Sequence, residues 1–296
     1  MTYAAAFATL VLGLLGQPLF VVILTFAMLG FVVQDIPLSV IGAELYRITD
    51  TPLLAAIPLF TFVGFLLSES NSSTRIVKLT DAFFGWMPSG LAFISLTTCA
   101  FFTAFTGASG ATIVALGALL LPALRHAKYP EKFSLGLVTS SGSLGLLLPP
   151  SVPLILFGIL AQQMNQGYNI TIEDLFIAGL MPTALMIILL AIYSFFAGGK
   201  AARKRLPFSF KNTLTALWEA KWELPLPVFV LGGIYSGYFA VSEAAAMTVF
   251  YTFVVEVFIY REIRLRDLTR ITSDAMVMVG GIMLVLATAL ALGNYF

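Results

Sequence analysis

Two short polar segments inside long apolar runs hold the residues best suited to chemistry. They are residues 106–110 (TGASG) and 140–151 (SSGSLGLLLPPS), and neither contains a charged side chain. Glycine and proline interrupt helical hydrogen bonding, which leaves carbonyl oxygens and N–H groups unpaired beside serine and threonine hydroxyls. Neutral oxygens suit a hard monovalent cation, and a helix N-terminus suits an anion. The two segments are therefore candidates for one ion-binding site.

Residue types within the segments support this interpretation. Gly107 and Gly110 permit positive φ and close approach, while Thr106, Ser109 and Thr112 offer hydroxyls. In the second segment, two consecutive prolines push the residues before them out of the helical region, so the carbonyls of residues 142–148 lose their partners. Ser151 is placed to cap the helix that follows.

Packing glycines and proline kinks are the simpler interpretation, because both are common in membrane helices. Either segment alone is compatible with it. Two such segments within 45 residues favour a site, since paired broken helices are typical of the binding site of a transporter.

Composition sets the class of protein. The 296 residues are 59% hydrophobic and only 10% charged, with a mean hydropathy of +0.97. Soluble domains have about one quarter charged residues, so the composition predicts an all-α polytopic membrane protein surrounded by lipid bilayer. A net charge of +1 argues against a nucleic acid partner. Cys99, the only cysteine, cannot form an internal disulfide and is predicted to be a core residue.

Apolar runs predict the membrane-crossing segments. Residues 3–33 are interrupted at Gly16-Gln17-Pro18 and form either one kinked span or two short helices. A polar loop is expected over 34–51. The further predicted spans are 52–67, 175–197, two within 224–260 that turn near 236–243, and 271–292. Residues 69–90 are instead amphipathic and suited to the membrane interface, with Trp86 at headgroup level.

Basic residues predict the orientation. Fifteen of the sixteen lysines and arginines fall in segments 69–90, 125–132, 198–223 and 261–270, and only Arg47 lies outside them. The positive-inside rule places these segments on the cytoplasmic face. Segments 69–90 and 125–132 share that face only if 91–124 enters the membrane and returns. We therefore predict a re-entrant helical hairpin over 91–124 with its tip near 106–110, followed by a discontinuous helix over 133–163.

Other polar residues receive structural interpretations. His126 is expected in a solvated cytoplasmic turn, and Glu243 at a helix start, where it favours the helix dipole. Glu256 is expected to snorkel or pair near the cytoplasmic edge. A G-x-S-G pattern around Ser109 raises the alternative of an intramembrane serine protease. The only histidine is 17 residues away, about 25 Å along a helix, so we reject this alternative.

Three stretches resemble a known family. They are FTGASGATIVALGALLLPAL, TSSGSLGLLLPPSVPLILFG and GGIYSGYFAVSEAAAMTVFY, which together with their surroundings cover most of the chain. They are similar to the large membrane subunit (M subunit, DctM type) of tripartite ATP-independent periplasmic (TRAP) transporters. The GSLG and PPSVP portions are the most specific.

The resemblance implies a function. It implies a permease subunit, and no enzyme, of a sodium-driven elevator transporter in the bacterial inner membrane that imports an organic acid such as a C4-dicarboxylate. The implied partners are a small four-helix Q subunit and a periplasmic substrate-binding P protein, and Na⁺ is the coupling ion. A passive channel or a structural membrane subunit remains the alternative from another class.

The resemblance also implies site residues. The complete candidate set for sodium and substrate is Thr106, Gly107, Ser109, Gly110, Thr112, Ser141, Gly142, Ser143, Gly145, Pro149, Pro150 and Ser151. The Na⁺ ligands would come from Thr106, Ser109, Ser141, Gly142, Ser143 and Gly145. Thr106 and Ala108 stand where the family frequently has serines, so Ala108 supplies no side-chain ligand.

The family pattern predicts the organisation of the chain. Residues 1–90 would be scaffold helices plus an interfacial arm, 91–163 the transport domain, 164–260 scaffold with a basic connector at 198–223, and 261–296 a second arm and the start of a second transport half. The family has an inverted second half with its own hairpin and broken helix. Phe296 precedes both, so we expect the chain to be a fragment of a longer protein.

Overall fold

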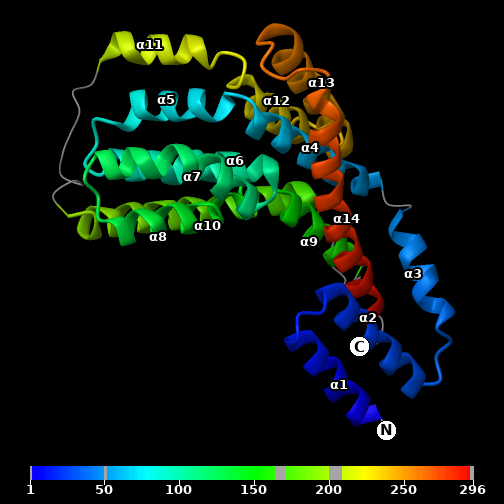
Figure 1. Ribbon diagram of the computed structural model, residues 1–296. Coiled ribbons are helices and arrows are strands. Elements are labelled where there is room, and N and C mark those ends of the chain that lie inside the picture. The colour runs from blue at the N-terminus through cyan, green and yellow to red at the C-terminus, as the bar shows by residue number, and fades with distance from the viewer. Residues whose placement is uncertain (1, 50–51, 164–170, 200–208, 294–296) are drawn as a thin grey trace. The chain divides into compact units, whose positions relative to one another are not determined.

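The computed structural model describes residues 2–49, 52–163, 171–199 and 209–293 (Figure 1). All regular secondary structure in these ranges is helical, which confirms the predicted all-α class. Four described helices are long and apolar enough to cross a membrane, and six crossings result if each of two bent helix pairs counts as one. The four are α7 (Ser109–His126), α10 (Ile172–Ala197), α13 with its π-helical extension (Val241–Ile259) and α14 (Asp267–Gly293). This arrangement fits a polytopic membrane protein.

The chain divides into two compact units, one of which comprises Met1–Ala55 and Met276–Phe296. Its helices are α1 (Thr2–Leu14), α2 (Leu19–Val33), α3 (Ser39–Thr49), a short 3₁₀ helix (Pro52–Ala55) and the C-terminal part of α14. Gly16 adopts φ +96° between α1 and α2, so residues 3–33 form two short helices rather than one kinked span.

The predicted loop over 34–51 is wrong for residues 39–49, which form α3. Ile41 is buried with Ala27, Phe31 and Ala291 in the small core of this unit, and Val40 packs against it. The sequence of α3 mixes polar and apolar residues, and its polar residues make it resemble a loop. Residues 50–51 of the predicted loop lie outside the described residues.

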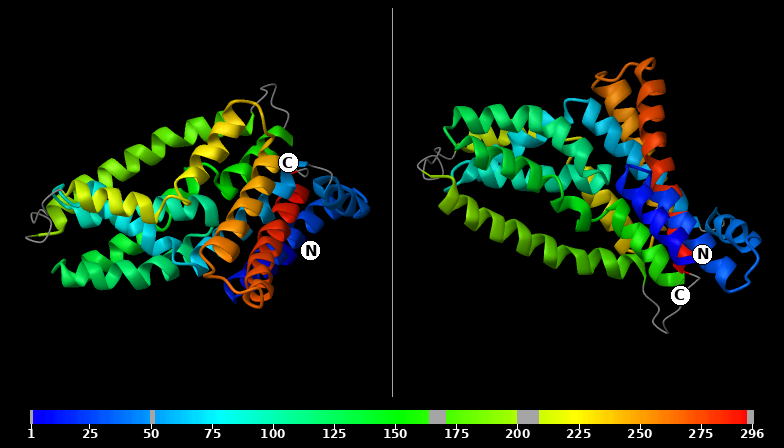
Figure 2. Two further views of the ribbon diagram at one scale, coloured as in Figure 1. Left: turned by 90° about the horizontal axis from the view of Figure 1, so that it is seen from above. Right: turned by 60° about the horizontal axis from the view of Figure 1, so that its bottom comes forward.

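The other unit, Ala56–Ala275, contains both segments of the candidate site. Its elements before α13 are α4 (Ala56–Glu69), α5 (Ser72–Phe84), α6 (Gly90–Thr106), α7, α8 (Glu131–Ser141), a 3₁₀ turn (Leu144–Leu147), α9 (Val152–Gln163), α10, α11 (Phe210–Glu219) and α12 (Pro225–Tyr235). α6 is the centre of this unit, because residues on nearly every side of it are buried. α5, α7 and α8 lie alongside α6, as the two views of Figure 2 also show.

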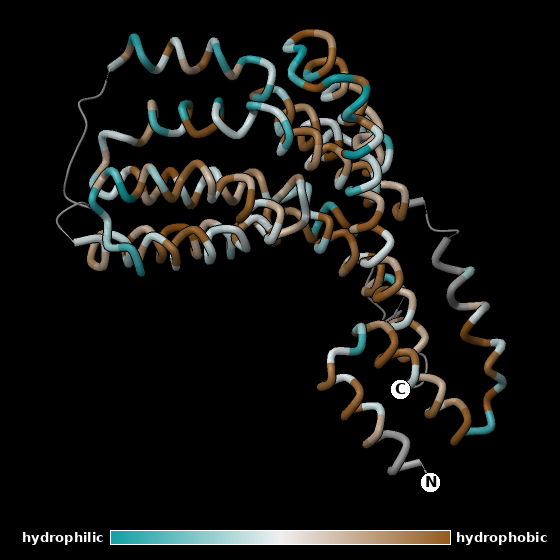
Figure 3. Tube along the Cα trace, viewed as in Figure 1, coloured by the Kyte–Doolittle hydropathy of each residue, from teal (hydrophilic) through white to brown (hydrophobic). Residues whose placement is uncertain are grey.

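The residues of the main core come mostly from α4, α6, α7 and α8, with Ile76 of α5, Leu144 of the 3₁₀ turn and Leu226 of α12 added. They include Val63, Leu96, Phe102, Leu116 and Leu137, all at most 5% exposed. The amphipathic helix predicted within 69–90 is α5, whose axis bends by 78° from that of α4. Hydrophilic and hydrophobic residues alternate along α5 and α11, whereas α10 is hydrophobic over most of its length (Figure 3).

The prediction of two spans within 224–260 needs a correction. Two helices are present, α12 and α13, and they are joined near the predicted turn. However, α12 has 11 residues and is about 17 Å long, which is short of the roughly 30 Å apolar thickness of a bilayer. Pro225 and Pro227 at its start limit α12, so only α13 is long enough to cross alone.

Candidate functional site

The first polar segment forms the tip of a helical hairpin. α6 ends at Thr106, Gly107 adopts φ +63°, and α7 begins at Ser109. The Gly107 N–H closes the end of α6 by donating to the carbonyl of Thr103 at 2.8 Å. A side chain at Gly107 would be strained because left-handed backbone disfavours a Cβ. The structure therefore has a helical hairpin with its turn at the predicted tip, and re-entrance of this hairpin into the membrane stays a prediction.

Two buried hydroxyls hold the hairpin tip together. The Oγ1 atoms of Thr106 and Thr112 are hydrogen-bonded to each other at 3.0 Å, and both side chains are at most 1% exposed. Each hydroxyl oxygen retains lone pairs, so both can still act as neutral oxygen ligands.

The second polar segment forms a discontinuous helix, also as predicted. α8 ends at Ser141, the 3₁₀ turn follows, and α9 begins at Val152 with a 42° bend across the break. Ser151 caps α9, because its Oγ accepts a hydrogen bond from the Leu154 N–H at 3.4 Å. The same hydroxyl donates to the carbonyl of Leu146, so one of the carbonyls freed at the break regains a partner.

The hairpin and the broken helix meet directly. The Thr103 hydroxyl of α6 donates to the carbonyl oxygen of Gly142 at 2.9 Å, and both residues are buried. A Cβ on Gly142 would lie 3.2 Å from the carbonyl oxygen of Ser109, at the start of α7. At the tip itself, a Cβ on Gly107 would lie 2.8 Å from the Val152 side chain. The two polar segments, distant in sequence, thus form one junction.

Glycines make this close approach possible. A Cβ on Gly145 would lie 2.6 Å from the Ala104 backbone nitrogen and still nearer to the Ala100 carbonyl. On the other side of the tip, a Cβ on Gly64 of α4 would come within 2.7 Å of the Thr106 nitrogen. Sequence reasoning missed Thr103 and Gly64. A threonine one helical turn before the end of α6 and a lone glycine inside an apolar run are the only signals they leave.

The twelve predicted site residues differ in how far they enter the junction. The buried ones are Thr106, Thr112, Ser141, Gly142, Gly145, Pro149, Pro150 and Ser151. Gly107 and Ser109 are half-buried, whereas Gly110 and Ser143 are exposed. None of the twelve is charged, so the junction offers neutral oxygens only. Among the described residues, no cluster of three or more His, Cys, Asp or Glu side chains is arranged to hold a metal.

The hairpin geometry also addresses the protease alternative. Ser109 and His126 are the first and last residues of α7, so about 25 Å of helix separates them. A base at that distance cannot activate a hydroxyl. His126 is exposed, as expected of a solvated residue, but it is the last residue of α7 and not part of a turn.

A buried ionic cluster lies away from the junction and was not foreseen. The Arg75 guanidinium of α5 pairs with Glu223 before α12, with Glu262 at 2.6 Å and with Glu256 at 3.6 Å, and its Cζ lies 3.8 Å from the centre of the Tyr260 ring. One cation thus faces three carboxylates at a place where α5 meets the ends of α12 and α13. Burial alone would raise the pKa of Glu262, but hydrogen bonds from Arg75 and the Asn71 N–H lower it below its usual value.

This cluster decides between the two alternatives for Glu256, which were snorkelling and pairing. The side chain pairs with Arg75 but does not snorkel to the edge, because Glu256 is fully buried and its Oε1 accepts from the Ser72 hydroxyl at 2.7 Å. The prediction for Glu243 is confirmed. It is the third residue of α13, and its carboxylate accepts from the Ala240 N–H at 3.0 Å.

Fold and site together define a class, namely a polytopic helical membrane protein in which a hairpin tip packs against a discontinuous helix. Comparison with known proteins identifies the family within that class. Residues 4–296 match the family described as Tripartite ATP-independent periplasmic transporter, DctM component. The chain belongs to this family, whose members are permease subunits of transporters.

Characterised relatives carry different substrates in their names. The chain is 32% identical over 88% of its length to the C4-dicarboxylate TRAP transporter large permease protein DctM of Rhodobacter capsulatus. It is 34% identical over 77% to the isethionate TRAP transporter permease protein DctMQ of Oleidesulfovibrio alaskensis, and 30% over 96% to the ectoine TRAP transporter large permease protein TeaC of Halomonas elongata. The matches span 61%, 35% and 65% of these three proteins, respectively.

Proposed function

We propose that the chain is the permease part of a sodium-driven, binding-protein-dependent secondary transporter that imports an organic acid across the bacterial inner membrane. The observation that carries this proposal is the junction, where neutral oxygens of the hairpin tip and of the helix break lie together in a protein of the TRAP family. Paired interrupted helices of this kind are typical transporter binding sites. Relatives named for a C4-dicarboxylate, isethionate and 2,3-diketo-L-gulonate support an organic acid as substrate.

The sodium ion would bind at the junction. Its proposed ligands are oxygens of Thr106, Ser109, Ser141, Gly142, Ser143 and Gly145. The proximity of the Gly142 position to the Ser109 carbonyl supports this set. For Ser143 the proposed ligand is its backbone carbonyl, which also accepts a hydrogen bond from the Leu146 N–H at 3.3 Å. An ion held by both elements would couple its binding to their joint movement, which is the basis of the proposed elevator mechanism.

The domain division follows from the same proposal. The hairpin and broken helix (91–163) would move as the transport domain, and residues 1–90 and 164–260 would supply scaffold and arm helices. The 78° bend between α4 and α5 supports a role for α5 as an arm that leaves the scaffold along the membrane surface. Residues 261–296 would be a second arm and the start of a second transport half.

Re-entrance of the hairpin is testable by accessibility labelling. In a Cys99→Ala background, Asp81→Cys in α5 and Lys132→Cys in α8 are both exposed positions that flank the hairpin. We expect a membrane-impermeant maleimide to label both positions in inverted vesicles, whose outer surface is the cytoplasmic face. The same reagent should label neither position in right-side-out vesicles. Labelling of the two positions from opposite faces would contradict the re-entrant topology and favour a single crossing by α7, which is long enough for it.

The requirement for partners tests the proposed function as a whole. We expect uptake of an organic acid by the full-length protein only when a small membrane subunit and a periplasmic binding protein are both present. Omission of either one should abolish uptake against a gradient. Downhill flux at an undiminished rate without either partner would instead support a passive channel.

A further inference from the structure

Helix α11 presents an exposed apolar stripe that the fold does not cover. Phe210, Leu214 and Trp218 are spaced four residues apart and therefore line one side of the helix. Their exposed fractions are 74%, 60% and 72%. The stripe is a separate surface from the packed side of α11, which holds Ala216 and, just after the helix end, Ala220 against Leu79 and Ala82 of α5.

Two lysines border this stripe without a carboxylate partner in the described part of the chain. Lys211 follows Phe210 on the exposed side of the helix. The Lys221 Nζ lies 4.2 Å above the centre of the Trp218 ring, so its ammonium group is held beside the stripe by a cation–π contact.

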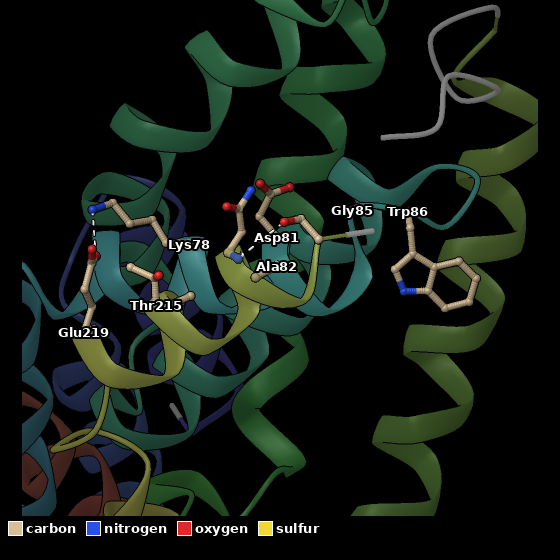
Figure 4. Close-up of a pocket in the computed structure, with 10 residues that line it drawn as sticks. Lys78, Asp81, Ala82, Gly85, Trp86, Thr215 and Glu219 are labelled. Carbon is tan, nitrogen blue, oxygen red and sulfur yellow. Dashed lines mark hydrogen bonds and ion pairs between the residues drawn. The ribbon is translucent and has the colours of Figure 1, made fainter. Parts of the chain in front are cut away.

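The two glutamates of segment 198–223 do not neutralise these lysines. Segment 198–223 contains two glutamates, Glu219 and Glu223, and six basic residues. Glu219 pairs with Lys78 of α5 at 2.9 Å, at the groove between α5 and α11 (Figure 4). Glu223 pairs with buried Arg75. Both carboxylates are thus engaged by cations of α5, and neither of them pairs with Lys211 or Lys221.

We propose that α11 and its flanking lysines form a binding surface for anionic phospholipids. The apolar stripe would enter the boundary between headgroups and acyl chains, with Trp218 at headgroup level. Lys211 and Lys221 would contact the lipid phosphates, each lysine near an anionic surface adding to the attraction. Lysines beside the stripe attract an anionic leaflet but not a neutral helix of a partner protein. This charge complementarity favours lipid as the molecule that covers the stripe. The proposal depends on the membrane class of the protein and not on the sodium site.

Tryptophan quenching by brominated lipids tests this surface. The chain would carry Trp86→Phe and Trp222→Phe so that Trp218 is the only tryptophan. It would be reconstituted, one copy per nanodisc, in two lipid mixtures based on phosphatidylcholine. One mixture contains brominated phosphatidylglycerol, and the other contains the same fraction of brominated phosphatidylcholine. We expect both to quench Trp218, and the anionic lipid to be enriched around it roughly fivefold at low salt, with the preference falling as salt is raised.

Lysine variants separate the two parts of the proposal. Lys211→Gln with Lys221→Gln should remove the preference for phosphatidylglycerol but keep quenching by phosphatidylcholine, whereas Lys132→Gln, an exposed lysine of α8, should leave the preference unchanged. Thermal melting of each variant verifies its fold. Equal quenching by the two lipids, or a preference that survives the double substitution, would contradict the anionic site. Absence of quenching by either lipid would show that protein covers the stripe and would overturn the proposal.

Discussion

Replacement of Arg75 by methionine is expected to destabilise the protein by about 3–5 kcal/mol, the usual consequence of removing one partner from a buried ionic group. The side chain of Arg75 is 10% exposed, and those of Glu223 and Glu256 are 2% and 1% exposed. Methionine fills similar space but leaves three carboxylates facing one another with no cation. Thermal unfolding of the purified protein in detergent measures the effect, expected as a fall in midpoint of roughly 10 °C.

Arg125→Met is the matched control. Arg125 pairs with Glu131 at 2.5 Å, but the two side chains are 52% and 66% exposed. Solvent-exposed ion pairs contribute about 0–1 kcal/mol to the free energy of unfolding, so this variant should melt close to the wild type. Addition of Glu223→Gln to the Arg75 variant should recover part of the loss, because it removes one buried charge. Equal melting of the Arg75 and Arg125 variants would show that the cluster is not a stabilising element.

Gly145→Ala is expected to abolish uptake and to lower stability by about 1–3 kcal/mol or more. The added Cβ would overlap backbone atoms of α6, the Ala100 carbonyl and the Ala104 nitrogen, which cannot rotate away as a side chain can. The broken helix would have to move off the hairpin, and the junction of their polar groups would open. Uptake and thermal melting of the same preparation report the two effects.

Gly136→Ala supplies the comparison on the same discontinuous helix. No atom lies within 4 Å of the position that a Cβ would take there, and Gly136 is inside α8. Alanine is the better helix former by about 1 kcal/mol, so this variant should be as stable as the wild type or more so. Normal uptake by Gly145→Ala would mean that close packing of the break on α6 is dispensable.

Much of the fold was predictable because local signals and tertiary structure agree. The turn at the tip requires positive φ, which Gly107 adopts readily. The tandem prolines before Ser151 end one helix, and Ser151 caps the next. The distribution of basic residues predicts a hairpin over 91–124, and α6 and α7 form a helical hairpin there. The sequence did not decide whether residues 3–33 form one kinked span or the two helices observed on either side of Gly16. The reason is that a proline is compatible with either a kink or a turn.

Contacts between distant residues were not predictable. Arg75 looked like one of several basic residues of an amphipathic helix, and nothing local shows that Glu223 and Glu256, far along the chain, converge on it. The hydrogen bond from Thr103 to Gly142 is hidden for the same reason. α3 was missed because an amphipathic helix with a short apolar face resembles a polar loop when its packing partners are unknown.

Sodium titration of uptake in the complete transporter tests the proposed ion site most directly. Gly142→Ala would place a Cβ 3.2 Å from the Ser109 carbonyl and against Ile113, so tip and break would separate slightly. Gly136→Ala is the control, since no atom lies within 4 Å of its Cβ position and Gly136 is outside the candidate site. We predict sodium-dependent uptake in the wild type and the Gly136 variant, with at least tenfold more sodium required by the Gly142 variant. Uptake that persists when potassium replaces sodium, or a wild-type sodium response in the Gly142 variant, would contradict the site.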